Sequence, residues 1–392
     1  MSKYKIITGT SAAAEAARLC NVDVIAAYPI TPQTTCVEKL AEFVANGELD
    51  AEYIKVESEH SAISACMGAS AVGARTFTAT ASQGLALMHE LLFASAGMRH
   101  PIVMMNANRA LSAPINIWND QQDSISQRDT GWIQLYAENN QETLDLIIQA
   151  FRIAENENIL LPVMVNLDGF ILTHTVEPVM IPDEKDVEDF VGVYEPKHAY
   201  MDPDNPTTQG AVGVPEYYME TKYDIQKTME KAKDVILEVN KEFAEKFKDI
   251  EVNGNGLIEK YNMDGAKTVI VAMGSICGSI KEIIDKLNEE GEKIGLLRII
   301  TYRPLPEEQI AEALKDAENI GILDKNIILG MNKGALYTDL STVLKNKKTV
   351  NFIVGLGGRD ITLEDIEHII KSTKTLEDGH TEWIGLNRYV NK

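Results

Sequence analysis

The fold of this chain is constrained most by a regular alternation of short apolar segments with helix-like segments in its first 180 residues. The apolar segments span residues 21–30, 51–56, 75–82, 100–110 and 160–170, and helical patterns fill residues 58–74, 83–98 and 141–156. Strands that are apolar throughout and alternate with helices are typical of a parallel sheet covered on both faces. The sequence therefore predicts an α/β domain over residues 1–180.

The remainder of the chain divides into a connecting segment and a second α/β unit. Residues 177–218 are rich in Pro, Asp and Gly and predict a connection without its own core. A long, highly charged amphipathic helix is predicted next, so residues 181–264 are interpreted as a linker. Strand and helix patterns resume over residues 265–392, including a single strand within 293–306 that runs into a Pro-bounded loop. The glycines at 355–358 predict a tight turn.

Charge and cysteine usage exclude several classes of function. The chain carries 59 Asp and Glu against 37 Lys and Arg, a net charge of -22, and such a surface repels nucleic acid and anionic membranes. No apolar run reaches membrane-spanning length and the N-terminal residues lack an apolar signal core, so we expect a cytoplasmic protein. The four cysteines are widely spaced, which argues against a metal site or an iron–sulfur cluster in this chain.

Four polar features follow predicted strands of the first domain, where ligands bind in open α/β sheets. They are Thr31 between two prolines, Glu59 at a helix start, the segment Thr80–Gly84, and Arg109. Each has an ordinary alternative interpretation. Thr31 can simply cap a turn, Glu59 can complement a helix dipole, Arg109 can form a surface ion pair, and Thr80–Gly84 can be a plain strand-to-helix turn.

Taken in order, these features resemble the pyruvate:ferredoxin oxidoreductase family of thiamine-diphosphate enzymes, in particular the alpha subunit of its multi-subunit 2-oxoacid:ferredoxin oxidoreductases. The resemblance is carried by five segments in the expected order: Tyr28–Pro32, Glu57–Ala62, Thr78–Glu90, Asn106–Asp123 and Leu296–Pro306. It implies a pyrimidine-type thiamine-diphosphate-binding parallel-sheet domain followed by a transketolase C-terminal-like α/β domain.

The resemblance also implies an activity. The expected reaction is the oxidative decarboxylation of pyruvate with coenzyme A to acetyl-CoA and CO2, with reduction of ferredoxin, or the reverse synthesis of pyruvate. The same machinery acting on 2-oxoisovalerate, 2-oxoglutarate or oxalate stays open as an alternative, and so does a non-catalytic scaffold subunit. The dicarboxylates 2-oxoglutarate and oxalate are disfavoured, because each needs a second fixed positive charge near the substrate.

The resemblance assigns roles to individual residues. Glu59 matches the catalytic glutamate that hydrogen-bonds N1′ of the aminopyrimidine, a task that favours a partly desolvated carboxyl group. Arg109 and Thr31 match the groups that bind the substrate carboxylate, and Asn108 and the loop 111–118 border the substrate pocket. Three residues of the opening loop complete the predicted cofactor contacts: Tyr28, Pro29 and Ile30.

Two elements of a complete thiamine enzyme are missing from the sequence: the Mg²⁺ motif and a cysteine set for an iron–sulfur cluster. A Gly-Asp-Gly motif for Mg²⁺ is not present, since Asp168, Asp264 and Asp378 precede a glycine but do not follow one. We therefore expect thiamine diphosphate to be shared with a beta subunit that brings Mg²⁺ and a proximal [4Fe-4S] cluster. Gamma and delta subunits, ferredoxin and coenzyme A are the other expected partners, in a heterotetramer. The small-residue helix over 62–74 is interpreted as a subunit contact or as close packing within the domain.

Overall fold

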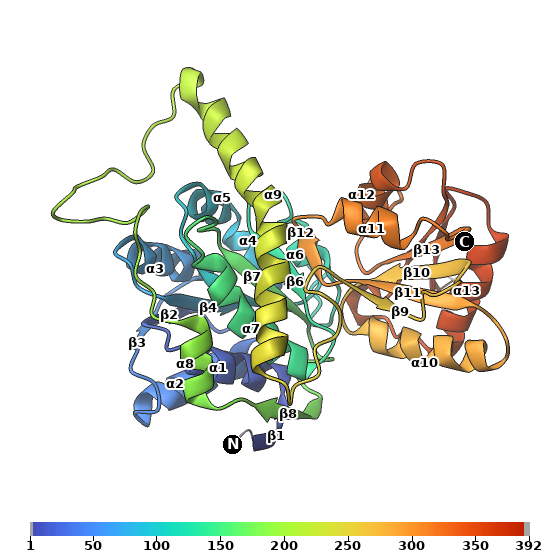
Figure 1. Ribbon diagram of the computed structural model, residues 1–392, viewed down its shortest axis with the longest axis horizontal. Helices are drawn as coiled ribbons and strands as arrows, with labels where there is room; N and C mark the ends of the chain where they lie inside the picture. Colours follow the sequence, from blue (N-terminus) through green and yellow to red (C-terminus); the bar gives the residue numbers. More distant parts are fainter. Residues whose placement is uncertain (1–2, 388–392) are drawn as a thin grey trace.

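The computed structural model describes residues 3–387 and contains two large sheets, each covered by helices (Figure 1). The first sheet has seven strands in the order β12-β6-β7-β5-β4-β2-β3, and all neighbours are parallel except β12 and β6. Its strands are β2 (Val24–Ala27), β3 (Glu52–Lys55), β4 (Thr76–Thr80), β5 (Val103–Asn108), β6 (Ile133–Tyr136), β7 (Val163–Asp168) and β12 (Thr301–Arg303).

Alternate residues of the central strands point into two different cores. Val103 and Met105 of β5 pack into one core, whereas Met104 packs into the other, as expected for a strand buried on both faces. The helices of the first core are α1 (Gly9–Leu19), α2 (Thr34–Ala45), α7 (Asn140–Ala154), α8 (Glu184–Val191) and α9 (Pro215–Lys246). The second face carries α3 (Glu59–Ala71), α4 (Ser82–Leu87) and α5 (His89–Gly97), whereas the short α6 (Gln122–Ile125) places Ile125 in a core of the second sheet.

The segment predicted as a connection without its own core contains a strand and a helix, and both pack into the core of the first domain. Strand β8 (Val176–Ile181) pairs antiparallel with β1 (Lys3–Thr8), and α8 buries Val187 and Phe190 in the first core. Phe190 meets Phe243 of α9 at 5.5 Å between ring centroids. The apolar residues of α8 are separated by acidic residues, so the sequence showed no clear apolar pattern there. Only residues 193–214 form an extended, exposed loop, which projects from the body at the upper left of Figure 1.

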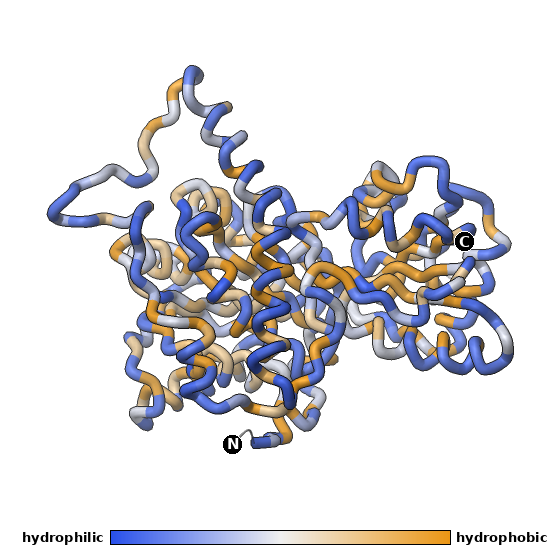
Figure 2. The backbone as a smooth tube through the Cα atoms, in the orientation of Figure 1, coloured by the Kyte–Doolittle hydropathy of each residue, from blue (hydrophilic) through white to orange (hydrophobic). Residues whose placement is uncertain are grey.

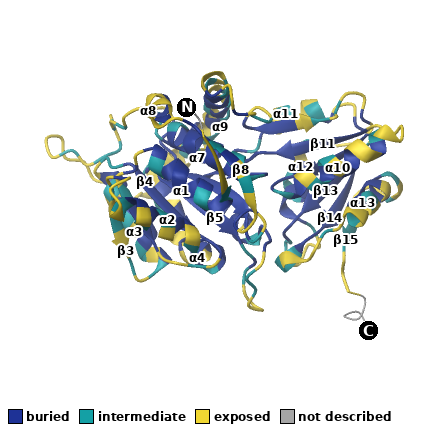
Figure 3. Cartoon of the chain, turned by 90° about the horizontal axis from the view of Figure 1, so that it is seen from below, coloured by how far each residue is buried: buried dark blue, intermediate teal, exposed yellow. Residues whose placement is uncertain are grey.

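The second sheet has six strands in the order β15-β14-β13-β10-β11-β9, with β9 antiparallel to its neighbour. Its strands are β9 (Ile258–Tyr261), β10 (Thr268–Ala272), β11 (Ile294–Ile299), β13 (Asn319–Asp324), β14 (Lys348–Ile353) and β15 (Thr381–Trp383). Its helices are α10 (Ile276–Glu289), α11 (Glu307–Ala313), α12 (Ala335–Val343), the 3₁₀ turn η1 (Leu356–Gly358) and α13 (Leu363–Thr375). Apolar strands of both sheets appear as orange tubes in Figure 2 and lie in the buried interior in Figure 3.

The two sheets exchange segments across the predicted boundaries. The single strand predicted within 293–306 is instead two strands: β11 belongs to the second sheet, and β12 crosses to pair with β6 of the first. Strand β9, which falls within the predicted linker 181–264, belongs to the second sheet. Ile300, between β11 and β12, packs into the core of the first sheet. The chain therefore buries apolar surface where it crosses from the second sheet to the first.

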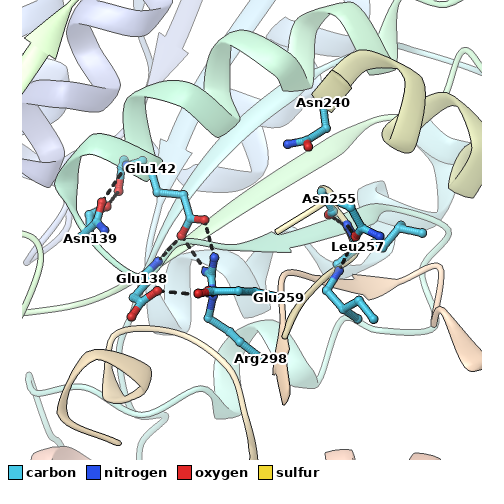
Figure 4. Close-up of polar contacts among 12 residues, drawn as sticks. Glu138, Asn139, Glu142, Asn240, Asn255, Leu257, Glu259 and Arg298 are labelled. Carbon is cyan, nitrogen blue, oxygen red and sulfur yellow. Dashed lines mark hydrogen bonds and ion pairs between the residues drawn. The ribbon is translucent and has the colours of Figure 1, made fainter. Parts of the chain in front are cut away.

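A buried ionic cluster joins the start of α7 to the second sheet (Figure 4). The Arg298 side chain is fully buried and donates to both carboxylate oxygens of Glu142 at 2.7 Å and to Glu259 at 2.6 Å. Lys281 of α10 lies 2.8 Å from both Glu138 and Glu259. Three carboxylates thus face two cations. Burial raises the pKa of Glu138 above its ordinary value, whereas the Arg298 charge outweighs burial and lowers that of Glu259.

Across residues 3–387, no helix combines the length and the apolar character that crossing a membrane requires.

Candidate active site

The loop that follows β2 is anchored by a buried glutamine, while other residues of the loop are exposed to solvent. The buried Gln33 side chain donates from Nε2 to the Ala79 carbonyl at 2.7 Å, and its Oε1 accepts from the Ile30 backbone N–H at 3.4 Å. Tyr28, Pro29 and Thr31 remain exposed. The loop is therefore anchored to the end of β4 while its tip faces outward, at the carboxyl edge of the parallel strands.

Arg109 and Thr31 lie together, although their strands β5 and β2 are separated by β4 in the sheet. Their binding of the substrate carboxylate, which the family resemblance implies, stays a prediction. Arg109 donates from Nη1 to the Thr31 backbone carbonyl at 3.0 Å and from Nε to the Asn116 carbonyl at 2.8 Å. The contact uses the Thr31 carbonyl rather than its hydroxyl, so the hydroxyl is left for another partner. Burial lowers the pKa of Arg109 from its ordinary value, but an arginine stays charged in any case.

Asp123 organises the strand ends beneath Arg109, a role that sequence reasoning missed. Its fully buried carboxylate accepts from the backbone N–H groups of Ser82 at 2.9 Å and Arg109 at 3.0 Å, and from Asn108 Nδ2 at 2.8 Å. Burial raises the pKa of Asp123 to about 6. The only available signal was its place at the end of the Asn106–Asp123 motif. One carboxylate thereby sets the spacing between the ends of β4 and β5.

Asn108 is fully buried at the end of β5. Its Nδ2 donates both to Asp123 Oδ1 and to Ser124 Oγ, the second at 2.7 Å, and its Oδ1 is buried without a hydrogen-bond partner among residues 3–387. The side chain therefore holds Asp123 in place below Arg109. Direct contact between Asn108 and a substrate stays a prediction.

Glu59 begins α3 and is buried. The helix is capped by Ser58, whose Oγ accepts from the Ser61 backbone N–H at 3.2 Å. The Glu59 carboxylate accepts no hydrogen bond from any described side chain or backbone group, and Thr80 Oγ1 nearby is buried and equally unpartnered within the described part of the chain. A Cβ atom on Gly84 would lie 2.5 Å from both Glu59 Oε1 and Thr80 Oγ1. Any larger residue at position 84 would displace the Glu59 carboxylate. The carboxylate is therefore a hydrogen-bond acceptor without a donor among the described residues.

The loop 111–118 reaches the second sheet. The Ala110 N–H donates to the Trp118 carbonyl at 3.0 Å, and Asn116 Nδ2 donates to the Gly357 carbonyl at 3.0 Å. Gly357 has a φ of 60°, in agreement with the tight turn predicted at 355–358. Ile115 at the loop tip is 84% exposed, so the loop is held at its base and open at its tip.

Asp168, at the end of β7, ties the site to the second sheet, although the sequence suggested it only as a rejected metal ligand. Its carboxylate accepts from Ser275 Oγ at 2.6 Å and lies 3.1 Å from Lys325 Nζ. Burial alone would raise the pKa of Asp168, but the Lys325 ammonium beside it lowers the pKa below its ordinary value. Asn119 Nδ2 donates to the same carboxylate at 3.1 Å. An aspartate at a strand end does not by itself indicate a contact with the second sheet, so the sequence did not predict this one.

Metal-binding side chains are not gathered at this site. Within residues 3–387 there is no group of three or more His, Cys, Asp or Glu side chains arranged to hold a metal ion. The four cysteines are buried free thiols: Cys20, Cys36, Cys66 and Cys277.

Comparison with known families identifies the fold. Residues 15–241 match the family described as pyruvate flavodoxin/ferredoxin oxidoreductase, thiamine diphosphate-binding, and residues 266–366 match the pyruvate:ferredoxin oxidoreductase core domain II. The chain belongs to the pyruvate:ferredoxin oxidoreductase family. The resemblance inferred from the motifs and the predicted α/β thiamine-diphosphate-binding fold are thereby confirmed.

Curated relatives of this family member cover nearly its whole length. Pyruvate synthase subunit PorA of Methanocaldococcus jannaschii is 70% identical over 386 residues, covering 98% of this chain and 99% of its own. The PorA subunit of Pyrococcus furiosus is 57% identical, covering 97% and 98%. Ketoisovalerate oxidoreductase subunit VorA of Pyrococcus horikoshii is 47% identical and covers 98% of both chains.

Solved structures support the fold alone, since their sequence identity is low. A 2-oxoglutarate:ferredoxin oxidoreductase from Magnetococcus marinus superposes with a TM-score of 0.71 at 19% identity, over 94% of this chain and 65% of that chain. A split-gene transketolase superposes with a TM-score of 0.56 at 14% identity, over 95% of this chain and 100% of that chain.

The site of this oxidoreductase subunit fits the aminopyrimidine of thiamine diphosphate. A flat ring with an N–H donor needs a buried hydrogen-bond acceptor, and the unpartnered Glu59 carboxylate is one. The ring also needs space beside that acceptor, which Gly84 leaves because it has no side chain. The loop that holds Tyr28, Pro29 and the partly buried Ile30 lies at the same sheet edge. The contacts of these three residues with the cofactor stay a prediction.

We predict that Gly84→Ala lowers the thiamine-dependent rate of the assembled enzyme by about 10²-fold, because a new Cβ displaces the Glu59 carboxylate and misplacement by about 1 Å has this effect. Steady-state kinetics at saturating cofactor measure it. Gly278→Ala is the matched control, since its Cβ meets nothing closer than 3.7 Å on the exposed side of α10. Equal rates for both variants would contradict the packing argument.

Proposed function

We propose that this chain is the alpha subunit of a pyruvate:ferredoxin oxidoreductase that depends on thiamine diphosphate and is inactive without its partner subunits. The complex decarboxylates pyruvate oxidatively with coenzyme A to acetyl-CoA and CO2 and reduces ferredoxin, or it runs the reaction in reverse. The proposal rests on 70% identity, over 98% of the chain, with the Pyruvate synthase subunit PorA of M. jannaschii. The unpartnered buried carboxylate of Glu59 supports it.

Three side chains of this chain would each have a separate role in the shared thiamine site. Thiamine diphosphate, when bound, supplies a nucleophilic carbon and accepts the electron pair left by decarboxylation. Glu59 holds a proton-bearing ring nitrogen, N1′, by a hydrogen bond that is strong because the carboxylate is buried. Arg109 and the Thr31 hydroxyl bind the pyruvate carboxylate, since a guanidinium donates in a fork and a hydroxyl adds one more donor. Asp123 keeps Arg109 at its position.

The rest of the site would come from other subunits in the cytoplasm. In this proposal a beta subunit carries Mg²⁺, the diphosphate contacts and a proximal [4Fe-4S] cluster, and gamma and delta subunits pass electrons to ferredoxin. The open tip of the 28–32 loop and the exposed side of α3 suit such a partner. His60, Ser64, Gly68 and Val72 form an exposed strip along α3 at i, i+4 spacing. Ser64 and Gly68 in the middle of this strip are small, so another backbone can approach closely there.

A second candidate substrate is 2-oxoisovalerate, because a VorA subunit is 47% identical over 98% of this chain. The two are separated by the substrate profile of the complex assembled from full-length subunits under anaerobic conditions. We expect coenzyme A-dependent ferredoxin reduction with pyruvate to exceed that with 2-oxoisovalerate or 2-oxoglutarate. A preference for the branched acid would replace pyruvate in the proposal. Failure of thiamine-dependent activity with every 2-oxo acid would favour the scaffold alternative.

We predict that Arg109→Ala lowers kcat/KM for pyruvate by about 10- to 100-fold. A hydrogen bond to a charged group contributes about 1.5–3 kcal/mol, and this variant removes one from the substrate carboxylate. The affinity of the complex for thiamine diphosphate, measured by titration, should change little. Arg152→Ala is the control, since Arg152 pairs with Glu242 on the far side of the first sheet. Unchanged kcat/KM in Arg109→Ala would remove Arg109 from the substrate site.

A further inference from the structure

Several strongly exposed apolar side chains lie on a projecting arm, defined here as residues 193–223. The arm consists of the extended loop 193–214 and the first turns of α9, where no residue is buried before Thr228. The arm stands away from the body in Figure 1, and its loop lies at the far left of Figure 3. Its large exposed apolar and aromatic side chains include Val193, Val212, Tyr217, Tyr218, Met219 and Tyr223.

Such a surface is unusual on a chain that works alone. Monomeric proteins rarely leave a contiguous apolar segment in water, and Tyr and Met are enriched in protein–protein interfaces. Val212 is 93% exposed and Met219 is 77% exposed, so the side chains gain nothing from the chain's own fold. The arm thus exposes apolar and aromatic side chains of the kinds that are enriched in interfaces.

The arm is nevertheless held at a defined place on the first domain. The Met201 backbone N–H donates to the Ala71 carbonyl at the end of α3 at 2.6 Å, and Gln209 Oε1 lies 2.8 Å from His100 Nε2 after α5. Lys222 Nζ stands 5.8 Å from the centre of the Phe93 ring on α5. The arm therefore borders the α3–α5 face at the end of α3 opposite Glu59.

This placement indicates which molecule covers the arm. Helix α3 runs 13 residues from Glu59 to Ala71, about 20 Å at 1.5 Å per residue. A protein domain of about 100 residues already has a radius of gyration of about 13 Å, so a domain seated over Glu59 extends along the whole of α3. A second copy of this chain is disfavoured, because each copy carries a net charge of -22.

We propose that the arm docks the subunit that completes the thiamine site at Glu59. The proposal rests on the proposed function, in which another subunit supplies the diphosphate side of that site. The exposed strip of α3 and the arm then form one continuous contact surface for that subunit. Tyr217, Tyr218 and Met219 lie at the end of this surface that is farther from Glu59. Aromatic side chains in such positions carry a large share of binding energy.

The test replaces Tyr217, Tyr218 and Met219 together by serine in the full-length chain, which is then assembled with its full-length partner subunits. We expect the concentration at which the complex half-dissociates, measured by sedimentation, to rise at least tenfold. The turnover number at saturating partner should stay near normal, because the arm lies at the other end of α3 from Glu59. The matched control is Leu329→Ser with Met331→Ser, two exposed apolar residues of the second domain.

Each outcome decides the proposal. Unchanged dissociation in the arm variant, or an equal rise in the control, overturns it. If the isolated chain forms a dimer that the arm variant abolishes while assembly with the partners is unaffected, a second copy is the occupant and the proposal is wrong. A wild-type complex that assembles through the arm yet has no thiamine-dependent activity would contradict the proposed function and leave the docking surface in place.

Discussion

Replacing Glu59 by glutamine is expected to lower the turnover number of the assembled enzyme by about 10²- to 10⁴-fold, the usual contribution of a positioned acid–base group. The substitution keeps the shape of the side chain and removes its ability to hold a proton at the cofactor ring. Because Glu59 has no hydrogen-bond partner among residues 3–387, the variant leaves no other group of this chain unpaired. Assembly should therefore be intact.

The measurement is coenzyme A-dependent ferredoxin reduction with pyruvate, alongside sedimentation of the complex. Glu52→Gln is the matched control, since Glu52 is an exposed carboxylate on the neighbouring edge strand β3. It should retain full activity. A Glu59→Gln complex that oxidises pyruvate at the wild-type rate would show that Glu59 is only a helix-start residue, the ordinary interpretation of a first-turn glutamate.

Replacing Arg298 by methionine should lower the free energy of unfolding by about 3–5 kcal/mol, the typical result of removing one partner from a buried ionic cluster. Arg298 is fully buried and bonds to Glu142 and Glu259, so its loss leaves three carboxylates, two of them buried, with Lys281 as the remaining cation of the cluster. Since Glu142 begins α7 of the first domain and Arg298 lies on β11, the junction between the sheets should loosen first (Figure 4).

Urea unfolding and calorimetry of the full-length chain provide the measurement. Arg152→Met is the control, because the Arg152–Glu242 pair is substantially exposed and such pairs contribute about 0–1 kcal/mol. The double variant Arg298→Met with Glu142→Gln should be less destabilised than the sum of its parts, since neutralising Glu142 removes part of the unpaired charge. Equal losses for Arg298→Met and Arg152→Met would mean that burial adds nothing to this cluster.

Local patterns were sufficient to predict most of the first sheet and the neighbourhood of its site. Strands that end at Ala27, Thr80 and Asn108 place their following loops at one edge because parallel strands share a direction. That rule places Thr31 and Arg109 at the same edge, whereas the 3.0 Å contact between them was found only in the tertiary structure. The start of α3 at Glu59 follows from Ser58 as its cap.

Other features depended on contacts far apart in the chain. Asn108 was predicted to border the substrate pocket, and its fully buried amide donates to Asp123, a contact that the sequence did not indicate. A strand end alone does not show what will later fold over it. The same holds for residues 184–191, where the apolar side chains of α8 acquire meaning only against Phe243 of α9.

The sequence by itself determined the family, the α/β class and the residues gathered at the strand ends, because motifs and periodicity are local properties of a chain. Only the tertiary structure decided how the two units are joined. Asp168 meets Lys325 across 157 residues and Arg298 meets Glu142 across 156, and strand β12 leaves one sheet for the other. Charged residues are ordinary at such positions in a sequence. Their burial and pairing are fixed only when distant segments exclude water between them.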